Sequence, residues 1–399
     1  MIFGMRFPRL RVIIVALVLL SQLYLFFRIR RAILSSDRSE RFKSVAIRLI
    51  GAAICLLFLL NAYILFLHIP WVDPPLAAQV GIFYPVAVWN FGSLFSALLL
   101  FLTRVAGGMW RMVAKRYRGR IDHTAPIPVD LGRRRFLQGG VAGLAAAPIV
   151  LSGYGAAYVS KSYDVEELTL PFGRSLRVAQ LTDIHAGIYM TRQDMRRYVD
   201  QVIALQPDLF VLTGDFISNS MSFLPGCAEE ISRVHARYGT FATLGNHEHL
   251  WGKPSEVQAV FRQHQILLLT NSHAVIQTAR GPFAVAGIDD IQWGHPDLEA
   301  ALRGLDSSTP TLLLSHRPEI FPEAAGSGIP LTLSGHYHGG QVKLSLLGVD
   351  FSMAHLRTPY PEGLYRIKAS HLYVSRGVGT TFTPVRLNAP PEVTLFNLI

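Results

Sequence analysis

The chain has 399 residues, enough for two or more domains; 50% of them are hydrophobic and 16% are charged. This composition excludes an ordinary soluble globule and indicates membrane segments. The net charge of +11 comes from the N-terminal third, because residues 1–135 hold 19 Lys and Arg against 5 Asp and Glu, whereas residues 136–399 hold 19 against 22. The basic residues flank apolar runs, which favours contact with anionic lipid head groups, and we expect no nucleic acid as a specific partner.

Four apolar stretches without charged residues predict an N-terminal helical transmembrane region of about four spans: residues 12–27, 49–67, 81–102 and 136–159. A bilayer core takes about 20 helical residues, so the last three are long enough, and Arg11 and Arg28 can snorkel to extend the first. None of the stretches contains Asp, Glu, Lys, Arg or His. Because pumps and proton relays need such groups within the membrane, a membrane anchor is favoured over a transporter.

The short segments between these stretches predict the orientation. Seven Lys and Arg lie between the first two stretches and nine lie between the third and fourth, whereas residues 68–80 carry none. Positive loops face the cytoplasm, so everything after the fourth stretch is expected on the extracytoplasmic side of the cell membrane. One observation opposes this orientation: it places the basic residues Arg6, Arg9 and Arg11 on the extracytoplasmic side.

The fourth stretch begins with "GRRRFLQGG", in which Arg133, Arg134 and Arg135 resemble a twin-arginine export signal placed inside the chain. The alternative is ordinary positive charge before a membrane helix. The small residues Ala145 to Ala147 resemble a cleavage site, so release from the membrane stays open.

The pattern changes near residue 174 to strands alternating with helices, which predicts an α/β core. We therefore divide the chain into a transmembrane region at 1–135, a fourth span and linker at 136–173, and a catalytic domain at 174–399. The expected strands are residues 176–184, 207–216, 241–247, 311–316 and 329–335, with an amphipathic helix over 191–205.

Each expected strand ends in residues that can bind metal: Asp183 and His185, Asp215, Asn246 and His247, His316, and finally His336 and His338. One such residue would mean little, but five consecutive strand ends with oxygen and imidazole donors point to one site. The donors include no thiolate, which suits Mn²⁺, Fe²⁺ or Zn²⁺. Such clusters serve two-metal hydrolysis.

The ordered blocks DxH, GD, GNH, a single His and GHxH resemble the calcineurin-like metallophosphoesterase superfamily over roughly residues 174–399. The stretches "GHYHGGQ", "LLSHRPE", "YVSRGVGTT" and "PPEV" are most similar to its bacterial membrane-associated or exported members. The resemblance implies a four-layer αββα sandwich with two divalent metal ions at the strand ends.

The resemblance also implies a role for each residue. One ion would be bound by Asp183, His185 and His338. The other would be bound by Asn246, His316 and His336, with Asp215 bridging the two. His247 would face the phosphate and stabilise or protonate the leaving oxygen, and the nucleophile would be a metal-bound hydroxide.

Two positions narrow the subfamily. Protein phosphatases of the superfamily carry a GDxxDRG block, but this chain has Ser218 where the second Asp would lie. UDP-diacylglucosamine hydrolases carry Arg in the third block, where this chain has His247. Both branches are therefore disfavoured.

Several weaker signals have two interpretations, a contact with the site or a purely local role: Glu248, His249, Asp289, Asp290 and Arg376. His355 and His371 are expected to have no function. Gly339 and Gly340 are expected to leave room for the phosphate.

The sequence as a whole predicts a multi-pass membrane-anchored, extracytoplasmic, dinuclear phosphoesterase. Its substrate would be a phosphodiester or diphosphate, for which proximity to the bilayer favours a lipid-linked molecule; a soluble phosphodiester or phosphomonoester is the alternative. The competing hypothesis is a non-catalytic metal-binding membrane protein, or a transporter with a phosphoesterase-like tail.

Overall fold

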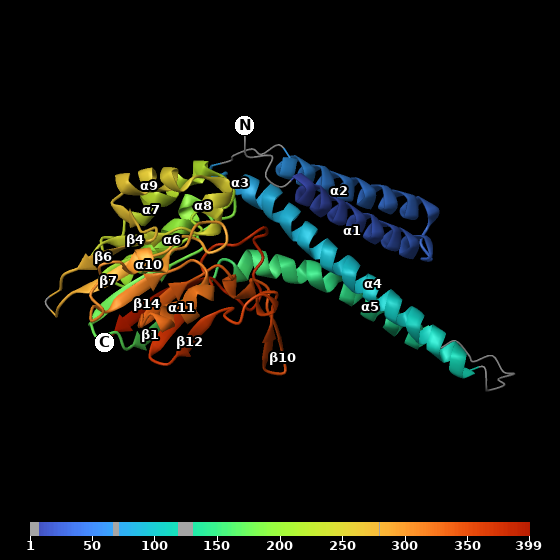
Figure 1. Cartoon of the computed structure of the whole chain (residues 1–399). Helices are drawn as coiled ribbons and strands as arrows, with labels where there is room; N and C mark the ends of the chain where they lie inside the picture. Colours follow the sequence, from blue (N-terminus) through green and yellow to red (C-terminus); the bar gives the residue numbers. More distant parts are fainter. Residues whose placement is uncertain (1–7, 67–71, 119–130, 279) are drawn as a thin grey trace. The chain divides into compact units, whose positions relative to one another are not determined.

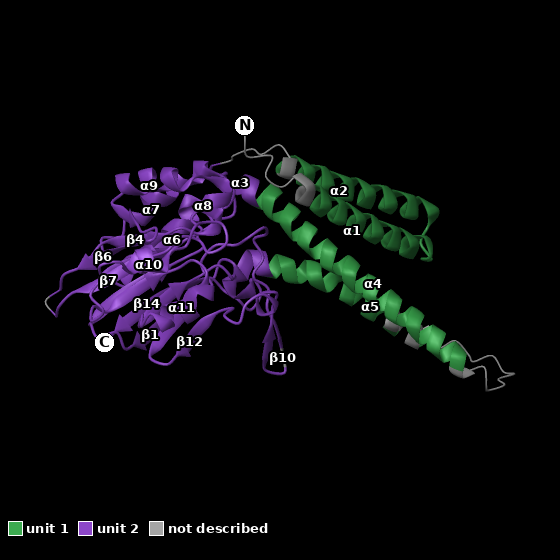
Figure 2. Ribbon diagram, viewed as in Figure 1, with its two compact units in different colours: residues 1–69, 80–154 green, residues 70–79, 155–399 purple. Residues whose placement is uncertain are grey.

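The computed structural model describes residues 8–66, 72–118, 131–278 and 280–399, which form two compact units (Figure 1, Figure 2). Unit 1 comprises residues 1–69 and 80–154, and unit 2 comprises residues 70–79 and 155–399. Arg6, which precedes the first apolar stretch, lies outside the described residues, as do residues 119–130 of the second basic segment.

Unit 1 consists of long helices: α1 (Pro8–Leu34), α2 (Glu40–Phe66), α4 (Tyr84–Arg118) and α5 (Leu131–Tyr154). Within the described residues, four segments are helical, long and apolar enough to cross a membrane: Val12–Leu34, Glu40–Ile64, Leu76–Arg116 and Gly139–Val159. The four predicted helices are therefore confirmed. Helices α1 and α2 extend past their apolar stretches, so the basic residues between those stretches lie mainly on helix ends.

Polar side chains lie between the helices of unit 1. Asn90 on α4 donates to Asn61 on α2 over 2.7 Å and accepts from Gln22 on α1 over 3.2 Å. Helix α5 approaches α4 closely at Gly92, where a Cβ atom would lie 2.7 Å from the Cα of Ile149. Small and amide residues at helix contacts are typical of membrane bundles.

Unit 2 is built on two six-stranded sheets. The first has the order β1 (Asp164–Leu170), β14 (Glu392–Leu398), β2 (Leu176–Leu181), β3 (Leu209–Thr213), β4 (Thr240–Thr243) and β5 (Ile266–Leu268). Strands β2 to β5 are parallel, and β14 runs antiparallel to β2. The parallel strands place their carboxyl ends at one edge.

The second sheet has the order β12 (Gly363–Ile367), β13 (Ser370–Val374), β9 (Leu331–Ser334), β8 (Thr311–Leu314), β7 (Phe283–Gly287) and β6 (Ser272–Ile276). Its four central strands, β13, β9, β8 and β7, are parallel, and both edge strands are antiparallel to their neighbours. A separate hairpin joins β10 (Leu344–Leu346) to β11 (Val349–Phe351).

Helices cover the outer faces of the sheets. Helices α6 (Arg192–Ala204), α7 (Leu224–Ile231) and α9 (Pro254–Gln263) contribute to one core with the first sheet, and α10 (Leu298–Leu302) and α11 (Phe321–Gly326) to another with the second. Shorter helices are α3 (Leu76–Ala78), α8 (Asn246–Trp251) and the 3₁₀ turns η3 (Met221–Phe223), η4 (Pro318–Ile320), η5 (His338–Gly340) and η6 (Ala354–Leu356). The central core joins side chains of both sheets, so the αββα fold is confirmed.

Alternation along the strands explains the layers. In β3, Leu209 and Val211 face the second sheet, whereas Phe210 and Leu212 face the helices. Both faces are buried, which is why the parallel strands appear in the sequence as continuous apolar runs. Gln180 links the sheets by donating to Thr213 Oγ1 and to the carbonyl of Ser334.

Candidate metal centre

The chain turns sharply where the site residues follow their strands. Five of them have left-handed backbone angles, with φ between 50° and 75°: Asp183, His185, Asp215, His336 and His338. Each such position costs on the order of 1–3 kcal/mol in a non-glycine residue, so the surrounding fold has to hold it. Backbone bonds do so: the amide of Asp183 donates to Gly214 O and that of His185 to Asp215 O.

Two glycines allow these turns to approach one another. A Cβ atom at Gly245 would collide with the Asp215 carboxylate, and one at Gly335 would collide with the Asp183 carboxylate. Glycine is therefore required in the GNH and GHxH blocks for steric reasons.

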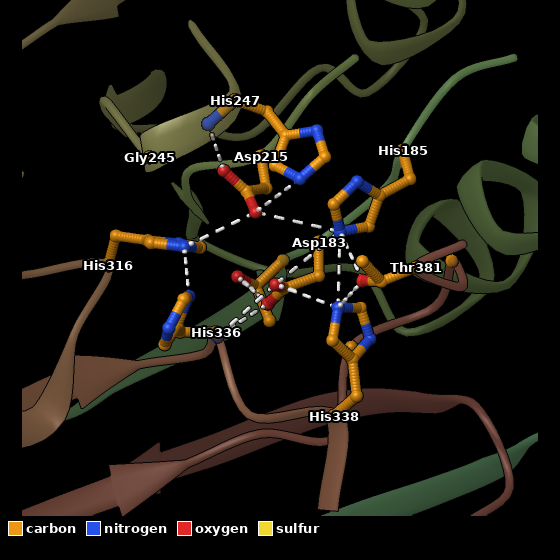
Figure 3. Close-up of polar contacts among 12 residues, drawn as sticks. Asp183, His185, Asp215, Gly245, His247, His316, His336, His338 and Thr381 are labelled. Atoms are coloured by element: carbon orange, nitrogen blue, oxygen red, sulfur yellow. Dashed lines mark hydrogen bonds and ion pairs between the residues drawn. The ribbon is translucent and has the colours of Figure 1, made fainter. Parts of the chain in front are cut away.

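The donors of the first group follow the carboxyl ends of β2 and β9. His185 Nε2 and His338 Nε2 lie 3.1 Å apart, and Asp183 Oδ1 lies 3.3 Å from His338 Nε2 and 3.8 Å from His185 Nε2 (Figure 3). All three residues are buried. Their arrangement brings together the residues expected to bind the first ion.

The donors of the second group lie at the start of α8 and after the carboxyl ends of β8 and β9. His316 Nε2 lies 3.2 Å from Asn246 Oδ1 and 3.1 Å from His336 Nδ1. His316 Nδ1 contacts the carbonyl oxygen of Thr213 at 2.8 Å, which orients the ring so that Nε2 points into the site. These are the residues expected to bind the second ion.

Asp215 lies between the two groups. Its Oδ2 is 3.6 Å from His185 Nε2 and 3.4 Å from His316 Nε2 (Figure 3). The backbone amide of His247 donates to its Oδ1 over 2.8 Å. One carboxylate oxygen thus faces both groups of donors.

Burial and neighbouring charges determine the protonation of the site. Burial raises the pKa of Asp183 to about 6 and lowers the pKa of His185 to about 3. Burial alone would lower the pKa of His316, but the charge and hydrogen bond of Asp215 raise it to about 10. Burial alone would raise the pKa of Asp215, but His316 and His247 hold it well below its ordinary value. Asp215 is thus ionised, and a divalent cation bound beside it would displace the proton of His316, because an imidazole binds metal in its neutral form.

The residues fit a divalent cation. Three overlapping trios have their donor atoms within 4.8 Å of one another: Asp183, His185 and His338; His185, Asp215 and His247; and Asp215, His316 and His336. Burial is the main cause that lowers the pKa of His185, and it also lowers those of His336 and His338, which favours the neutral imidazole that binds metal. Clustered imidazole, carboxylate and amide donors suit borderline divalent ions.

The comparisons with known proteins agree with this geometry. The family model for calcineurin-like phosphoesterases matches residues 176–340, which include all eight candidate residues. Uncharacterized metallophosphoesterase YkuE of Bacillus subtilis (strain 168) is 30% identical over 280 residues, which cover 67% of this chain and 98% of that protein. The chain belongs to the calcineurin-like phosphoesterase family.

Two further relatives of this phosphoesterase differ in length. Phosphodiesterase YaeI of Escherichia coli (strain K12) is 28% identical over 278 residues, covering 67% of this chain and 100% of that protein. A transmembrane protein with metallophosphoesterase domain from Danio rerio is 31% identical over 265 residues, covering 61% of this chain and 59% of that protein. The likeness therefore includes relatives whose names describe membrane proteins.

His247 of the phosphoesterase lies at the side of the site. Its Nδ1 contacts the backbone oxygen of Ser218 at 2.5 Å, and its Nε2 is 3.9 Å from Asp215 Oδ2. Ser218 occupies the position where protein phosphatases carry a second Asp. A main-chain carbonyl at this position can thus orient the histidine without a carboxylate.

Glu248 has a defined role that the sequence left open. It is fully buried, and its carboxylate accepts the backbone amides of Asp215, Phe216 and Gly245. These bonds connect the GD and GNH turns. Glu248 is thus a positioning residue for Asp215 rather than a solvated loop residue.

Arg317 was missed in the sequence, although it follows His316 directly. Its Nε donates to Asp290 Oδ2 over 3.0 Å, its Nη2 donates to Asn246 Oδ1 over 3.3 Å, and its Nη1 lies 2.7 Å from His336 Nε2. Asp290 is therefore connected to the site through Arg317. The "SHRPE" block was a possible signal, since it puts a cation beside a candidate ligand.

Arg386 and Thr381 were also missed. Thr381 Oγ1 lies 3.0 Å from His338 Nε2. Arg386 is completely buried, and its guanidinium donates to His338 Nδ1 over 3.1 Å and to the carbonyls of Gly377 and Gly379. The C-terminal segment therefore orients the ring of His338 through the contact of Arg386 with its Nδ1.

The remaining weaker signals have local partners. His249 Nε2 lies 2.7 Å from Asp289 Oδ1. Arg376 forms ion pairs with Asp164, Glu166 and Glu392.

One expectation is wrong. Gly339 and Gly340 do not leave open space for phosphate, because a Cβ atom at either would collide with Glu362 or with Ser352. The two glycines instead let later segments of the chain pack against the turn that carries His338. Neither His336 nor His338 lies on strand β9, which ends at Ser334.

Proposed function

We propose that the phosphoesterase is a membrane-anchored, extracytoplasmic enzyme that uses two divalent ions, of Mn, Fe or Zn, to hydrolyse a phosphodiester or diphosphate. The observation that supports two ions is the position of Asp215, whose Oδ2 faces His185 at 3.6 Å and His316 at 3.4 Å. A single ion would use only one of the two groups of donors. A shared carboxylate between two groups fits a bridging ligand.

In this proposal each ion is held by three residues besides Asp215. The first is held by Asp183, His185 and His338. The second is held by Asn246, His316 and His336. When bound, the ions supply Lewis-acid chemistry, which activates water and neutralises the charge of the phosphate.

His247 acts on the leaving group. Because its Nδ1–H donates to the Ser218 carbonyl, Nε2 points toward the site, from where the imidazolium form would give its Nε2 proton to the departing oxygen. The backbone amide of the same residue holds Asp215, so the acid and the shared ligand keep a constant separation.

Arg317 binds the phosphate. Asp290 fixes its guanidinium through Nε, and the two terminal nitrogens lie beside Asn246 and His336. Arginine offers five N–H donors, so it can contact phosphate oxygens while keeping its bond to Asp290.

Two observations support the proposed topology. Asp73, in the segment between the second and third spans, accepts the backbone amide of Arg192 over 2.9 Å. Residues 155–159 at the end of the fourth span also belong to unit 2. Both segments can lie on one side of a membrane only if an even number of crossings separates them; in the four-span topology the third and fourth spans separate them, which makes two crossings. The positive charge of the basic segments then favours a position of unit 2 outside the cytoplasm, with or without a twin-arginine signal.

Replacing the shared ligand tests the site. Purified full-length Asp215→Asn should hydrolyse bis(p-nitrophenyl) phosphate roughly 100-fold or more slowly than the native protein in Mn²⁺, because loss even of an outer partner of a ligand costs about 10–100-fold. The matched control is Asp306→Asn on an exposed loop, which should leave the rate unchanged. A variant with native divalent-dependent activity would show that Asp215 is not in the site.

Fusion of reporters after Ile399 tests the side of the membrane. Alkaline phosphatase, which requires export, should be active there, and a reporter that is active only in the cytoplasm should be inactive. The opposite pair of results would reverse the orientation while leaving the site unaffected.

A further inference from the structure

Unit 2 exposes a concentrated group of large apolar side chains. Six lie within thirteen residues of the β10–β11 hairpin and its return, and a seventh follows Thr381; we call these seven the apolar rim: Leu344, Leu347, Val349, Phe351, Met353, Leu356 and Phe382. Leu347 at the hairpin tip is 95% exposed and Phe382 is 91% exposed. A soluble surface disperses such residues, so their concentration indicates a contact surface.

The hairpin segment has little charge, and the charge that it has is paired with Lys343. Asp350 is the one charged residue in positions 344–356, and it forms an ion pair with Lys343 over 3.3 Å. Lys343 also pairs with Glu362 over 2.5 Å. The next charged residue, Arg357, is exposed and adjoins the rim. An apolar surface bordered by an exposed cation suits an anionic lipid interface.

The apolar rim is attached directly to the candidate metal centre. The hairpin leaves the turn of His338 at Lys343, and it returns at Ser352, whose side chain packs on Gly340. Phe382 follows Thr381, which contacts His338. Figure 1 shows the β10–β11 hairpin extending away from the two sheets of unit 2.

The same region receives the end of the fourth span. A Cβ atom at Gly155 would meet Arg386 O, Val385 Cγ1 and Leu387 Cδ2. Leu387 in turn pairs with the start of the hairpin, since Lys343 N donates to Leu387 O and Leu387 N donates to Gln341 O. Residue 387 therefore touches both the end of the span and the base of the hairpin.

The length of the fourth span leaves no linker between the bilayer and this region. The apolar segment Gly139–Val159 has 21 residues. At 1.5 Å per residue it is about 31 Å long, which matches a hydrocarbon core of about 30 Å. On this length, Gly155–Val159 would end the span at the membrane interface, with the hairpin base beside it.

We infer that the apolar rim inserts into the head-group region of the bilayer crossed by the chain's own helices, so that the metal centre faces the head groups of lipids. The substrate is then a phosphoester in a lipid head group; this second statement rests on the proposed function. The hairpin holds the active-site turn at the surface, and lipids reach it by lateral diffusion.

A fluorophore at the hairpin tip tests the insertion. Cys227 is buried and Cys55 is exposed, so a Cys55→Ser background lets Leu347→Cys be labelled selectively with an environment-sensitive dye. In full-length protein reconstituted into vesicles of phosphatidylethanolamine and phosphatidylglycerol, emission should shift to the blue and be quenched by brominated lipid. The matched control is Val275→Cys on β6, another exposed apolar position of unit 2, which should show neither change.

Equal quenching at both positions, or none at Leu347, would overturn the inference. So would a blue shift that appears in detergent and grows with protein concentration, because it would identify a second copy of the chain as the partner.

Activity measurements separate this inference from the proposed function. Leu347→Asp should lower the ratio of vesicle-lipid hydrolysis to bis(p-nitrophenyl) phosphate hydrolysis by about tenfold or more, because interfacial binding scales with the buried apolar area. The vesicle probes are phosphatidic acid, phosphatidylglycerol and a polyprenyl diphosphate. An unchanged ratio, or native protein that cleaves the soluble diester but none of the three lipids, would overturn the inference alone. Absence of divalent-dependent cleavage of the soluble diester would overturn the proposed function.

Discussion

The two units of the chain bury polar side chains of different kinds. In unit 1, Gln22, Asn61 and Asn90 are neutral amides that connect three helices by hydrogen bonds. In unit 2, the candidate metal centre buries carboxylates and imidazoles whose ionisation depends on one another, as for Asp215 and His316. Neutral amides can stabilise helix packing by themselves, whereas a buried ionisable cluster needs a compensating charge and is typical of a functional site.

The largest effect should follow from removing a ligand in unit 2. His316→Ala is expected to lower divalent-dependent diester hydrolysis roughly 100-fold or more and to reduce the metal content, since a ligand contributes more than the outer partners that cost about 10–100-fold. Elemental analysis and rates measure both. His235→Ala on the exposed surface is the control. Full metal content in His316→Ala would show that His316, and with it the second group of donors, does not bind metal.

A smaller effect should follow from changing the cation that adjoins the ligands. Arg317→Lys keeps the charge but cannot contact Asp290, Asn246 and His336 together, so kcat/KM should fall about 10–100-fold. Metal content should stay native, which separates this variant from His316→Ala. Exposed Arg303→Lys controls for a general effect of the substitution. Native kcat/KM in Arg317→Lys would exclude a phosphate-binding role.

The amides of unit 1 should affect stability without affecting catalysis. Asn90→Ala removes the bonds to Gln22 and Asn61, and it should lower the free energy of unfolding by about 1 kcal/mol while kcat for the soluble diester stays constant. A lowered melting temperature in detergent would report the change. Thr103→Ala, whose hydroxyl donates to Leu100 O of its own helix, should have less effect. A lower kcat in Asn90→Ala would show that the amides of unit 1 affect catalysis as well as stability.

The smallest effect concerns the His249–Asp289 pair, which should make stability depend on pH. Burial alone would lower the pKa of His249, but Asp289 raises it; burial alone would raise the pKa of Asp289, but His249 lowers it. The histidine contribution is complete below its ordinary pKa of 6.5 and is lost as the pH rises through the raised value. The aspartate contribution is present above 3.8 and is lost as the pH falls through the lowered value.

The substitution His249→Gln should therefore destabilise most between pH 3.8 and 6.5, by about 1 kcal/mol, and least at alkaline pH. Melting temperatures of both proteins in chelator, across that range, measure the difference without a contribution from metal loss. A difference that does not vary with pH would exclude the ion pair.

Much of the fold was predictable because it depends on local patterns. Strands β2, β3, β4, β8 and β9 are buried on both faces, so each appears as an apolar run ending in a polar residue. The predicted strands are longer than the observed ones at their carboxyl ends. The reason is that Asp183, Asp215 and His336 leave the strand direction with positive φ angles.

The residues that were missed depend on contacts far apart in the sequence. Arg386 is surrounded by carbonyls of its own C-terminal segment and contacts His338, 48 residues earlier. An arginine in a sequence usually indicates an exposed position, and no nearby pattern shows that this one is buried. Arg317 received no role for the same reason, because its partner Asp290 lies on another loop.

The sequence alone determined the membrane segments and the five blocks of candidate ligands, since hydrophobic length and residue order are local properties. Only the tertiary structure decided which donors face each other around Asp215, and that β14 pairs between β1 and β2. It also revealed that the exposed hairpin adjoins the end of the fourth span. These arrangements come from sheet pairing and turn geometry between distant segments, which the local patterns of apolar and polar residues do not encode.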